Sequence, residues 1–278
     1  MFGLVMPDFA NSSVWLSLVT LTFLEIVLGI DNIIFISISA GKIPEKLQKK
    51  AANIGMMLAM VMRIALLLGI SILIAMNEPW FHINNTFIKA GMSGQSLILI
   101  GGGIFLLYKS VTEIHHKLEG EDPHLGIQNR KKSTLSKAIV EITMINIVFS
   151  FDSILTAVGM TNGLQGALVL MIIAVVISVI IMLVFVVPVG RFVNKHPSIQ
   201  MLGMAFLILI GFMLILEGAH LGHLSILGNE IGSVPKGYLY FAIAFSLGVE
   251  FLNMKLRKKE SPVQLHGATE DATIEGII

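Results

Sequence analysis

The sequence contains no cysteine among its 278 residues. Disulfide bonds, zinc–thiolate centres and thiol redox chemistry are therefore excluded, so any metal site must use oxygen or nitrogen ligands. Nucleotide-binding and hydrolytic patterns are missing as well, because the chain has no GxxxxGK[ST], HExxH or GxSxG stretch. We therefore expect a protein that is not an enzyme, needs no cofactor and does not use ATP.

Charged residues are scarce. They make up 13% of the chain, against 55% for hydrophobic residues, whereas a soluble domain carries about 25% charged residues. Apolar runs near the membrane-spanning length of about twenty residues recur along the sequence. They do not alternate with polar residues as the strands of a membrane barrel do. The composition predicts an all-α, polytopic membrane protein surrounded by the lipid bilayer, without a nucleic-acid partner.

Seven segments are expected to span the membrane, roughly at 13–40, 51–76, 94–112, 138–160, 164–187, 199–217 and 236–255. Basic residues gather after the first, third, fifth and seventh spans, and the other connections contain only Lys89 and Lys236. Because positive loops stay in the cytosol, we expect an external N-terminus and a cytosolic C-terminus. Residues 1–260 would form one transmembrane domain and 261–278 a disordered tail.

The first span contains polar residues that a bilayer disfavours. Its stretch LEIVLGIDNIIF, residues 24–35, includes Glu25, Asp31 and Asn32. An ionised side chain near the bilayer centre costs roughly 2.5–3.5 kcal/mol on insertion scales, so such residues mark functional sites by default.

The fourth span contains a matching stretch, INIVFSFDSILT, at residues 145–156. The polar positions of the two stretches correspond one to one: Glu25 with Asn146, Asp31 with Asp152, and Asn32 with Ser153. A weaker similarity joins GGIFLLYK at 102–109 to IGFMLILE at 210–217. The chain is therefore predicted to contain two three-helix repeats, at about 13–112 and 138–217, and an additional seventh helix.

Three spans per repeat make the two repeats inverted relative to each other, an organisation typical of transporters with a binding site at the bilayer midplane. In each repeat the two main polar positions bracket the middle of the helix, about 9 Å apart along its axis. Gly29 lies between Glu25 and Asp31 and could let the first helix open, aiming both carboxylates at one point. The oxygen ligands of Glu25, Asp31, Asn146 and Asp152 would suit Mn²⁺, Mg²⁺ or Ca²⁺.

A purely structural role is the alternative, because Arg63 in the second span could pair with one of the acids, most directly Glu25. One arginine cannot neutralise Glu25, Asp31 and Asp152 together. The smaller polar residues Asn32 and Ser153 could instead join helices by hydrogen bonds.

Three further groups have two readings each. Glu141 lies on nearly the same helix face as Asp152 and is either an ion relay from the cytosol or a solvated acid. The run Glu217, His220 and His223 is either an external release site or a solvated helix end. The cytosolic loop at 113–136, which includes His115, His116 and His124, could sense a metal, although such loops are ordinarily only solvated.

Several stretches resemble the paired signatures of the TerC family of bacterial integral membrane proteins: EIVLGIDNIIFISI, FSFDSILTAVGM and PKGYLYFAIAFSLGVEFLNM. The resemblance covers about residues 12–258. It implies a seven-helix fold in the bacterial cytoplasmic (inner) membrane and manganese efflux, with the tellurium-resistance association of the family name. It also implies metal-coordinating roles for Glu25, Asp31, Asn146 and Asp152, with Asn32 as a lesser candidate.

Together these features predict a Mn²⁺ exporter that works by alternating access and exchanges the metal for protons. The alternative is a membrane scaffold that transports nothing and is associated with protein export or with the tellurite and metal stress response.

Overall fold

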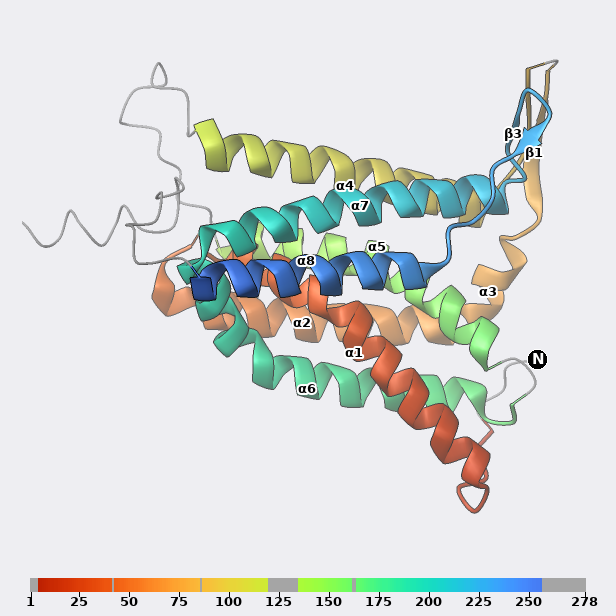
Figure 1. Ribbon diagram of the computed structural model, residues 1–278. Coiled ribbons are helices and arrows are strands. Elements are labelled where there is room, and N and C mark those ends of the chain that lie inside the picture. Colours follow the sequence, from red (N-terminus) through yellow and green to blue (C-terminus); the bar gives the residue numbers. More distant parts are fainter. Residues whose placement is uncertain (1–4, 42, 86, 120–134, 162–163, 257–278) are drawn as a thin grey trace, which may run out of the picture.

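The computed structural model (Figure 1) describes residues 5–41, 43–85, 87–119, 135–161 and 164–256. These residues form helices α1 (Ser12–Ala40), α2 (Glu45–Leu68), α3 (Ile70–Ala75), α4 (Gly94–Glu119), α5 (Leu135–Met160), α6 (Ala167–Lys195), α7 (Pro197–Leu221) and α8 (Lys236–Leu256). Four short strands, β1 (Pro79–Asn84), β2 (Ile88–Ser93), β3 (Ser225–Ile226) and β4 (Asn229–Glu230), form one antiparallel sheet in that order.

Every helix except α3 is long and apolar enough to cross a membrane, which confirms the seven predicted spans. Several helices extend beyond the expected apolar segments: α2 begins at Glu45, α4 continues to Glu119 and α6 to Lys195. Hydropathy detects only the part of a helix that suits lipid, whereas backbone hydrogen bonds continue into the polar turns beyond it. The second expected span is divided at Gly69, where α2 ends and α3 begins.

The long helices lie side by side and define two ends of the molecule (Figure 1). The sheet end carries β1 to β4, together with the start of α1 and α8. The basic end is the opposite one, where α1 ends and α2 begins. Described basic residues near the basic end are Lys46, Lys49, Lys50, Lys117, Lys137, Arg191, Lys195 and Lys255.

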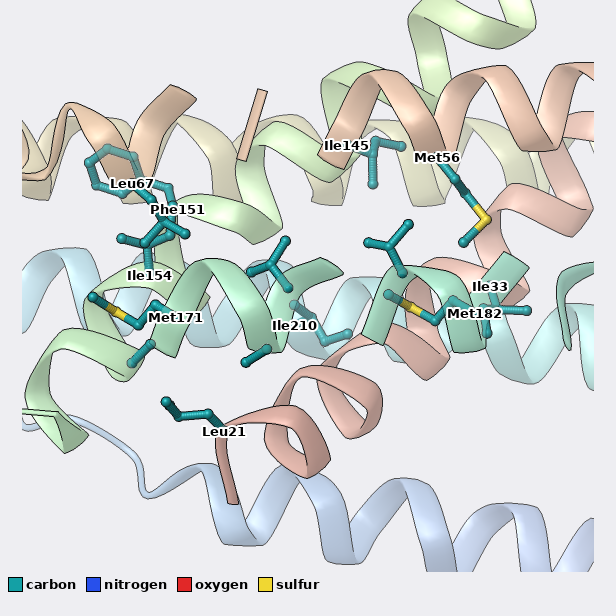
Figure 2. Close-up of a cluster of buried hydrophobic side chains, with 14 of the residues drawn as sticks. Leu21, Ile33, Met56, Leu67, Ile145, Phe151, Ile154, Met171, Met182 and Ile210 are labelled. Atoms are coloured by element: carbon teal, nitrogen blue, oxygen red, sulfur yellow. The ribbon is translucent and has the colours of Figure 1, made fainter. Parts of the chain in front are cut away.

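Helices from the two halves of the chain pack against one another. The most extensive contacts join α4 to α7, α1 to α6 and α2 to α5, whereas α8 is largely exposed and touches mainly α7. Figure 2 shows part of the shared core, which is built by Leu21 and Ile33 of α1, Met56 and Leu67 of α2, Ile145, Phe151 and Ile154 of α5, Met171 and Met182 of α6, and Ile210 of α7. The core therefore joins the two halves rather than lying within each.

The α4–α7 contact depends on two glycines that the weaker sequence similarity had aligned. A Cβ on Gly103 would lie 2.5 Å from the carbonyl oxygen of Gly211, and one on Gly211 would lie 2.9 Å from that of Gly103. Small residues at such crossings let membrane helices approach closely.

We expect Gly103→Ala to lower the free energy of unfolding by about 1–3 kcal/mol, because the added methyl group overpacks this crossing. Gly101→Ala is the matched control on the same helix, since a Cβ there meets nothing within 4 Å. The control should be neutral or stabilise α4 by up to about 1 kcal/mol. Melting curves of the two purified variants in detergent test this, and equal melting temperatures would contradict it.

Gly29 does not open the first helix, so that expectation is wrong for this conformation. Helix α1 is continuous from Ser12 to Ala40. A Cβ on Gly29 would collide with the Sδ atom of Met182 in α6. The glycine therefore serves close packing between α1 and α6 rather than a break in the helix.

Two predicted polar segments lie largely outside the described residues. The structure does not describe residues 120–134 of the predicted loop, which include His124, or residues 257–278, which contain the predicted tail. The beginning of the expected loop is helical, since α4 continues to Glu119. His115 there lies 3.3 Å from the carboxylate of Glu119 in an exposed i,i+4 pair.

Candidate functional site

Arg63 of α2 is buried between α1 and α5 and contacts both. Its Nη1 atom donates a hydrogen bond to Oε2 of Glu25, and its Nη2 atom donates one to Oγ of Ser153. The three residues are only 6%, 3% and 2% exposed. The pairing of Glu25 with Arg63, which the sequence offered as the alternative to a metal-ligand role, is present in the structure, and it explains how α1 accommodates a buried carboxylate.

Asp152 of α5 has a different cationic partner, Lys236, the first residue of α8. The Nζ atom of Lys236 lies 2.8 Å from each carboxylate oxygen of Asp152 and 2.5 Å from Oγ1 of Thr156. The Thr156 hydroxyl donates its own proton to the Asp152 backbone carbonyl at 3.0 Å, which leaves its lone pairs for the ammonium group. Three oxygens therefore surround the positive charge.

This ion pair lines a cavity of about 590 Å³, mouth included, between α5, α7 and α8. The polar lining consists of Arg63, Asp152, Glu217, Lys236 and Tyr240, and apolar side chains such as Phe149 and Leu214 complete it. The cavity is thus lined by two acidic and two basic side chains. The two acids come from different helices, Asp152 from α5 and Glu217 from α7.

Two of the polar residues that surround Asp152 were not predicted as site residues. Thr156 follows Asp152 by four positions, a spacing that places both on one helix face, so its position was detectable in the sequence. Lys236 was assigned only to a connection, although it was the one basic residue there. Its contact with a residue 84 positions earlier depends on how α8 packs.

Glu217 separates from the histidines that follow it. It lines the cavity, whereas His220 and His223 are exposed beyond it. The His220 Nδ1 atom lies 3.2 Å from the carbonyl oxygen of Ile231. An external release site formed by all three residues is not present, because no group of three or more His, Asp and Glu residues in the described chain is arranged to hold a metal.

The remaining predicted ligands lie nearer the basic end. Asp31 is part of α1, but its side chain lies outside the described part of the structure. Asn146 donates a hydrogen bond to the carbonyl oxygen of Ile142 at 2.8 Å. The buried Oδ1 atom of Asn32 has no hydrogen-bond partner among the described residues. Among the described side chains, Glu25 is paired with Arg63 and Asp152 is paired with Lys236.

Glu25 and Ser153 lie at one level of the bundle, because Arg63 contacts both. Helices α1 and α5 run antiparallel to each other (Figure 1). Asp31 follows Glu25 by six residues and Asn146 precedes Asp152 by six, so each lies about 9 Å farther along its helix towards the basic end. The predicted ligands therefore form two levels: one with Glu25 and Asp152, and one with the backbones of Asp31 and Asn146.

A second ionic cluster lies towards the basic end, around Glu141 of α5. Its carboxylate is 2.8 Å from the Nζ atom of Lys109 in α4 and accepts a hydrogen bond from the Ser39 hydroxyl at 3.3 Å. Lys109 is also 4.0 Å from the carboxylate of Glu113. The Glu141 side chain is only 10% exposed, so the reading of it as a solvated acid is wrong.

The chain matches the protein family described as "Integral membrane protein TerC family" over residues 10–262. It is 44% identical over 253 residues to the UPF0053 inner membrane protein YgdQ of Escherichia coli (strain K12), covering 91% of this chain and 97% of that protein. A UPF0053 protein of Haemophilus influenzae is 40% identical over 249 residues, 90% of this chain and 97% of the relative.

A longer relative, the UPF0053 inner membrane protein YoaE of Escherichia coli (strain K12), is 40% identical over 268 residues. The match covers 95% of this chain but 48% of that protein, so the chain spans about half of its length. No solved structure matches the chain.

Proposed function

The chain belongs to the TerC family of integral membrane proteins and is a multi-pass protein of the bacterial inner membrane, and from this we propose that it exports Mn²⁺ by alternating access. The observation that carries the proposal is the oxygen-lined cation site at Asp152. There a carboxylate and a hydroxyl already hold one positive charge, the ammonium group of Lys236, beside a cavity that a second acid, Glu217, also lines.

The chemistry of this site favours a hard divalent cation. Carboxylate and hydroxyl oxygens are ligands that Mn²⁺, Mg²⁺ and Ca²⁺ accept, and thiolates are absent from the chain. Asp31 and Asn146 would add oxygen ligands at the neighbouring level when the helices rearrange. The preference for manganese within this group comes from the family resemblance.

The packing of the helices supports an inverted repeat. In the two repeats α1 corresponds to α5, α2 to α6 and α4 to α7. The contact of α1 with α6 therefore corresponds to the contact of α5 with α2, and both contacts are extensive. The contact of α4 with α7 corresponds to itself, with Gly103 and Gly211 at equivalent places. Two similar halves that meet at a polar centre can rock against each other to change access to it.

We place the sheet end outside the cell and the basic end in the cytosol, following the positive-inside rule. The Asp152 cavity would then serve the external side, and the ion pair of Lys109 with Glu141 would close the cytosolic side. In the opposite conformation this pair separates and the metal reaches the carboxylates from the cytosol.

Lys236 would act as a tethered replacement for the metal. When the dication leaves towards the outside, the ammonium group occupies the same oxygens, so the carboxylate is never left unpaired in a partly dry cavity. A metal that returns from outside must displace it, which favours release over rebinding.

The energy for export must come from an ion gradient. Moving a divalent cation outward against 100 mV costs about 4.6 kcal/mol, twice the single-charge figure. Protons suit this role because carboxylates that release a metal can return protonated.

Inside-out vesicles that contain the protein provide the test. We expect them to accumulate Mn²⁺ when their lumen is acidic and to stop when a protonophore collapses the pH gradient. Uptake that ignores the gradient would overturn proton exchange, and uptake no greater than in protein-free vesicles would overturn export itself. Competition by Mg²⁺ and Ca²⁺ in the same vesicles measures selectivity.

A non-transporting membrane scaffold is the second candidate. The observation that favours it is that two of the described intramembrane acids, Glu25 and Asp152, are already paired with basic side chains of the protein. A scaffold would need these groups only to hold helices together, so it should tolerate replacements that keep the shape of the side chain.

A further inference from the structure

The sheet at the end of the bundle has one apolar and one polar face. Residues that pair across antiparallel strands lie on the same face, so the strand register assigns each side chain. One face carries Phe81, Ile83, Ile88, Ala90, Met92 and Ile226, with Asn229 opposite Ile226 at the edge. The other face carries His82, Asn84, Lys89, Gly91, Ser225 and Glu230.

The apolar face is turned towards the helices. Met92 lies on this face, and its Sδ atom is 3.5 Å from Oγ of Ser96 in the first turn of α4. The same sulfur atom would lie 3.4 Å from a Cβ on Gly222, which follows α7. The polar face is therefore the one directed away from the bundle.

The outer part of the apolar face covers nothing in the described chain. Figure 1 shows the sheet projecting sideways past α4 at the ends of the helices. Phe81, Ile83, Ile88 and Ile226 are between 41% and 46% exposed, although Ala90, nearer the bundle, is buried. The two loop tips carry Phe87 and Leu227, which are 63% and 69% exposed.

We propose that this apolar face lies on the lipid leaflet at the sheet end of the bundle. Strand β2 leads directly into α4, and the apolar side chains of Leu97 and Ile98 at the start of that helix are exposed as well. A sheet that extends sideways at the ends of membrane-spanning helices lies along the membrane surface. Aromatic and aliphatic side chains are stabilised in that interface, while the polar face stays in water.

The proposal goes beyond transport, because it assigns the sheet a membrane contact whatever passes through the bundle. Helices α4 and α7 both join this sheet, which would then fix their depth in the bilayer. The occupant is a phospholipid surface rather than a second protein.

The absence of native cysteine makes a direct test available. Ile83→Cys on the apolar face and His82→Cys on the polar face are labelled with an environment-sensitive fluorophore and reconstituted into phospholipid vesicles. Ile88→Cys and Lys89→Cys provide a second matched pair on β2. Quenching is measured with nitroxide-labelled phospholipids and with iodide present on both sides of the membrane.

We expect the labels at residues 83 and 88 to be quenched several-fold more strongly by the lipid nitroxide than their neighbours, and the labels at residues 82 and 89 by iodide. Equal iodide quenching at all four positions would overturn the proposal, because the sheet would then stand in water. Protection of residues 83 and 88 from both quenchers would also overturn it, because a protein would then cover the face.

Discussion

Arg63→Met is expected to lower the free energy of unfolding by about 3–5 kcal/mol, the usual cost of removing one partner from a buried ion pair. The substitution leaves the Glu25 carboxylate without its cation and the Ser153 hydroxyl without its donor, both in a nearly dry environment. Thermal melting of the purified protein in detergent measures this loss. Arg191→Met is the control, since Arg191 is exposed near the basic end.

The double variant Arg63→Met, Glu25→Leu should recover most of the lost stability, because no charge is then left unpaired. If Arg63→Met melts like the unmodified protein, the buried pair does not have the energetic role assigned to it.

The same double variant separates the two readings of Glu25. If Glu25 only neutralises Arg63, the double variant should accumulate Mn²⁺ in inside-out vesicles at the rate of the unmodified protein. If Glu25 also ligates the metal during transport, the double variant should be stable and yet transport poorly. Stability and uptake are therefore measured on the same preparation.

Asp152→Asn is expected to reduce Mn²⁺ uptake by about 10- to 100-fold, because a charge-assisted interaction contributes about 1.5–3 kcal/mol. An amide keeps the shape of the side chain but cannot attract a dication in the cavity as a carboxylate does. Cells that depend on this protein should lose manganese tolerance, with the variant still inserted in the membrane. Total cellular manganese measures the effect.

Two further variants make the result specific. Glu78→Gln removes an exposed acid near the sheet end and should leave uptake unchanged. Lys236→Met keeps Asp152 and removes its ammonium partner, so Mn²⁺ should bind more tightly than in the unmodified protein. Full manganese tolerance in cells with Asp152→Asn would instead favour the scaffold.

The polar positions in the spans were readable from the sequence because the bilayer penalises each of them locally. Glu25 and Asp152 stood out in apolar runs, and Arg63 was the one base available to Glu25 near the middle of a neighbouring span. The pairing of Glu25 with Arg63 was accordingly one of two readings that the sequence left open. The partner of Asp152 was not foreseen, because Lys236 seemed to belong to a loop and reaches the site only through the packing of α8.

Other differences have similar causes. Gly29 suggested a possible break in the first helix. In the structure α1 is continuous, and the glycine instead allows close packing against Met182. Glu141 had two readings, an ion relay or a solvated acid, and the structure places it between helices against Lys109 and Ser39. Strands β1 and β2 fell in a connection whose pairing with β3 depends on residues more than a hundred positions away.

By itself the sequence determined the class of protein, its seven spans, its family and the positions of its intramembrane charges. The class, the spans and the charges follow from the local cost of placing a segment or side chain in lipid, whereas the family follows from the resemblance of three motifs. Only the tertiary structure decided which cation meets which acid, which residues share the cavity and which face of the sheet is turned towards the bundle. Those outcomes depend on how helices distant in the chain pack, and no local free energy specifies that.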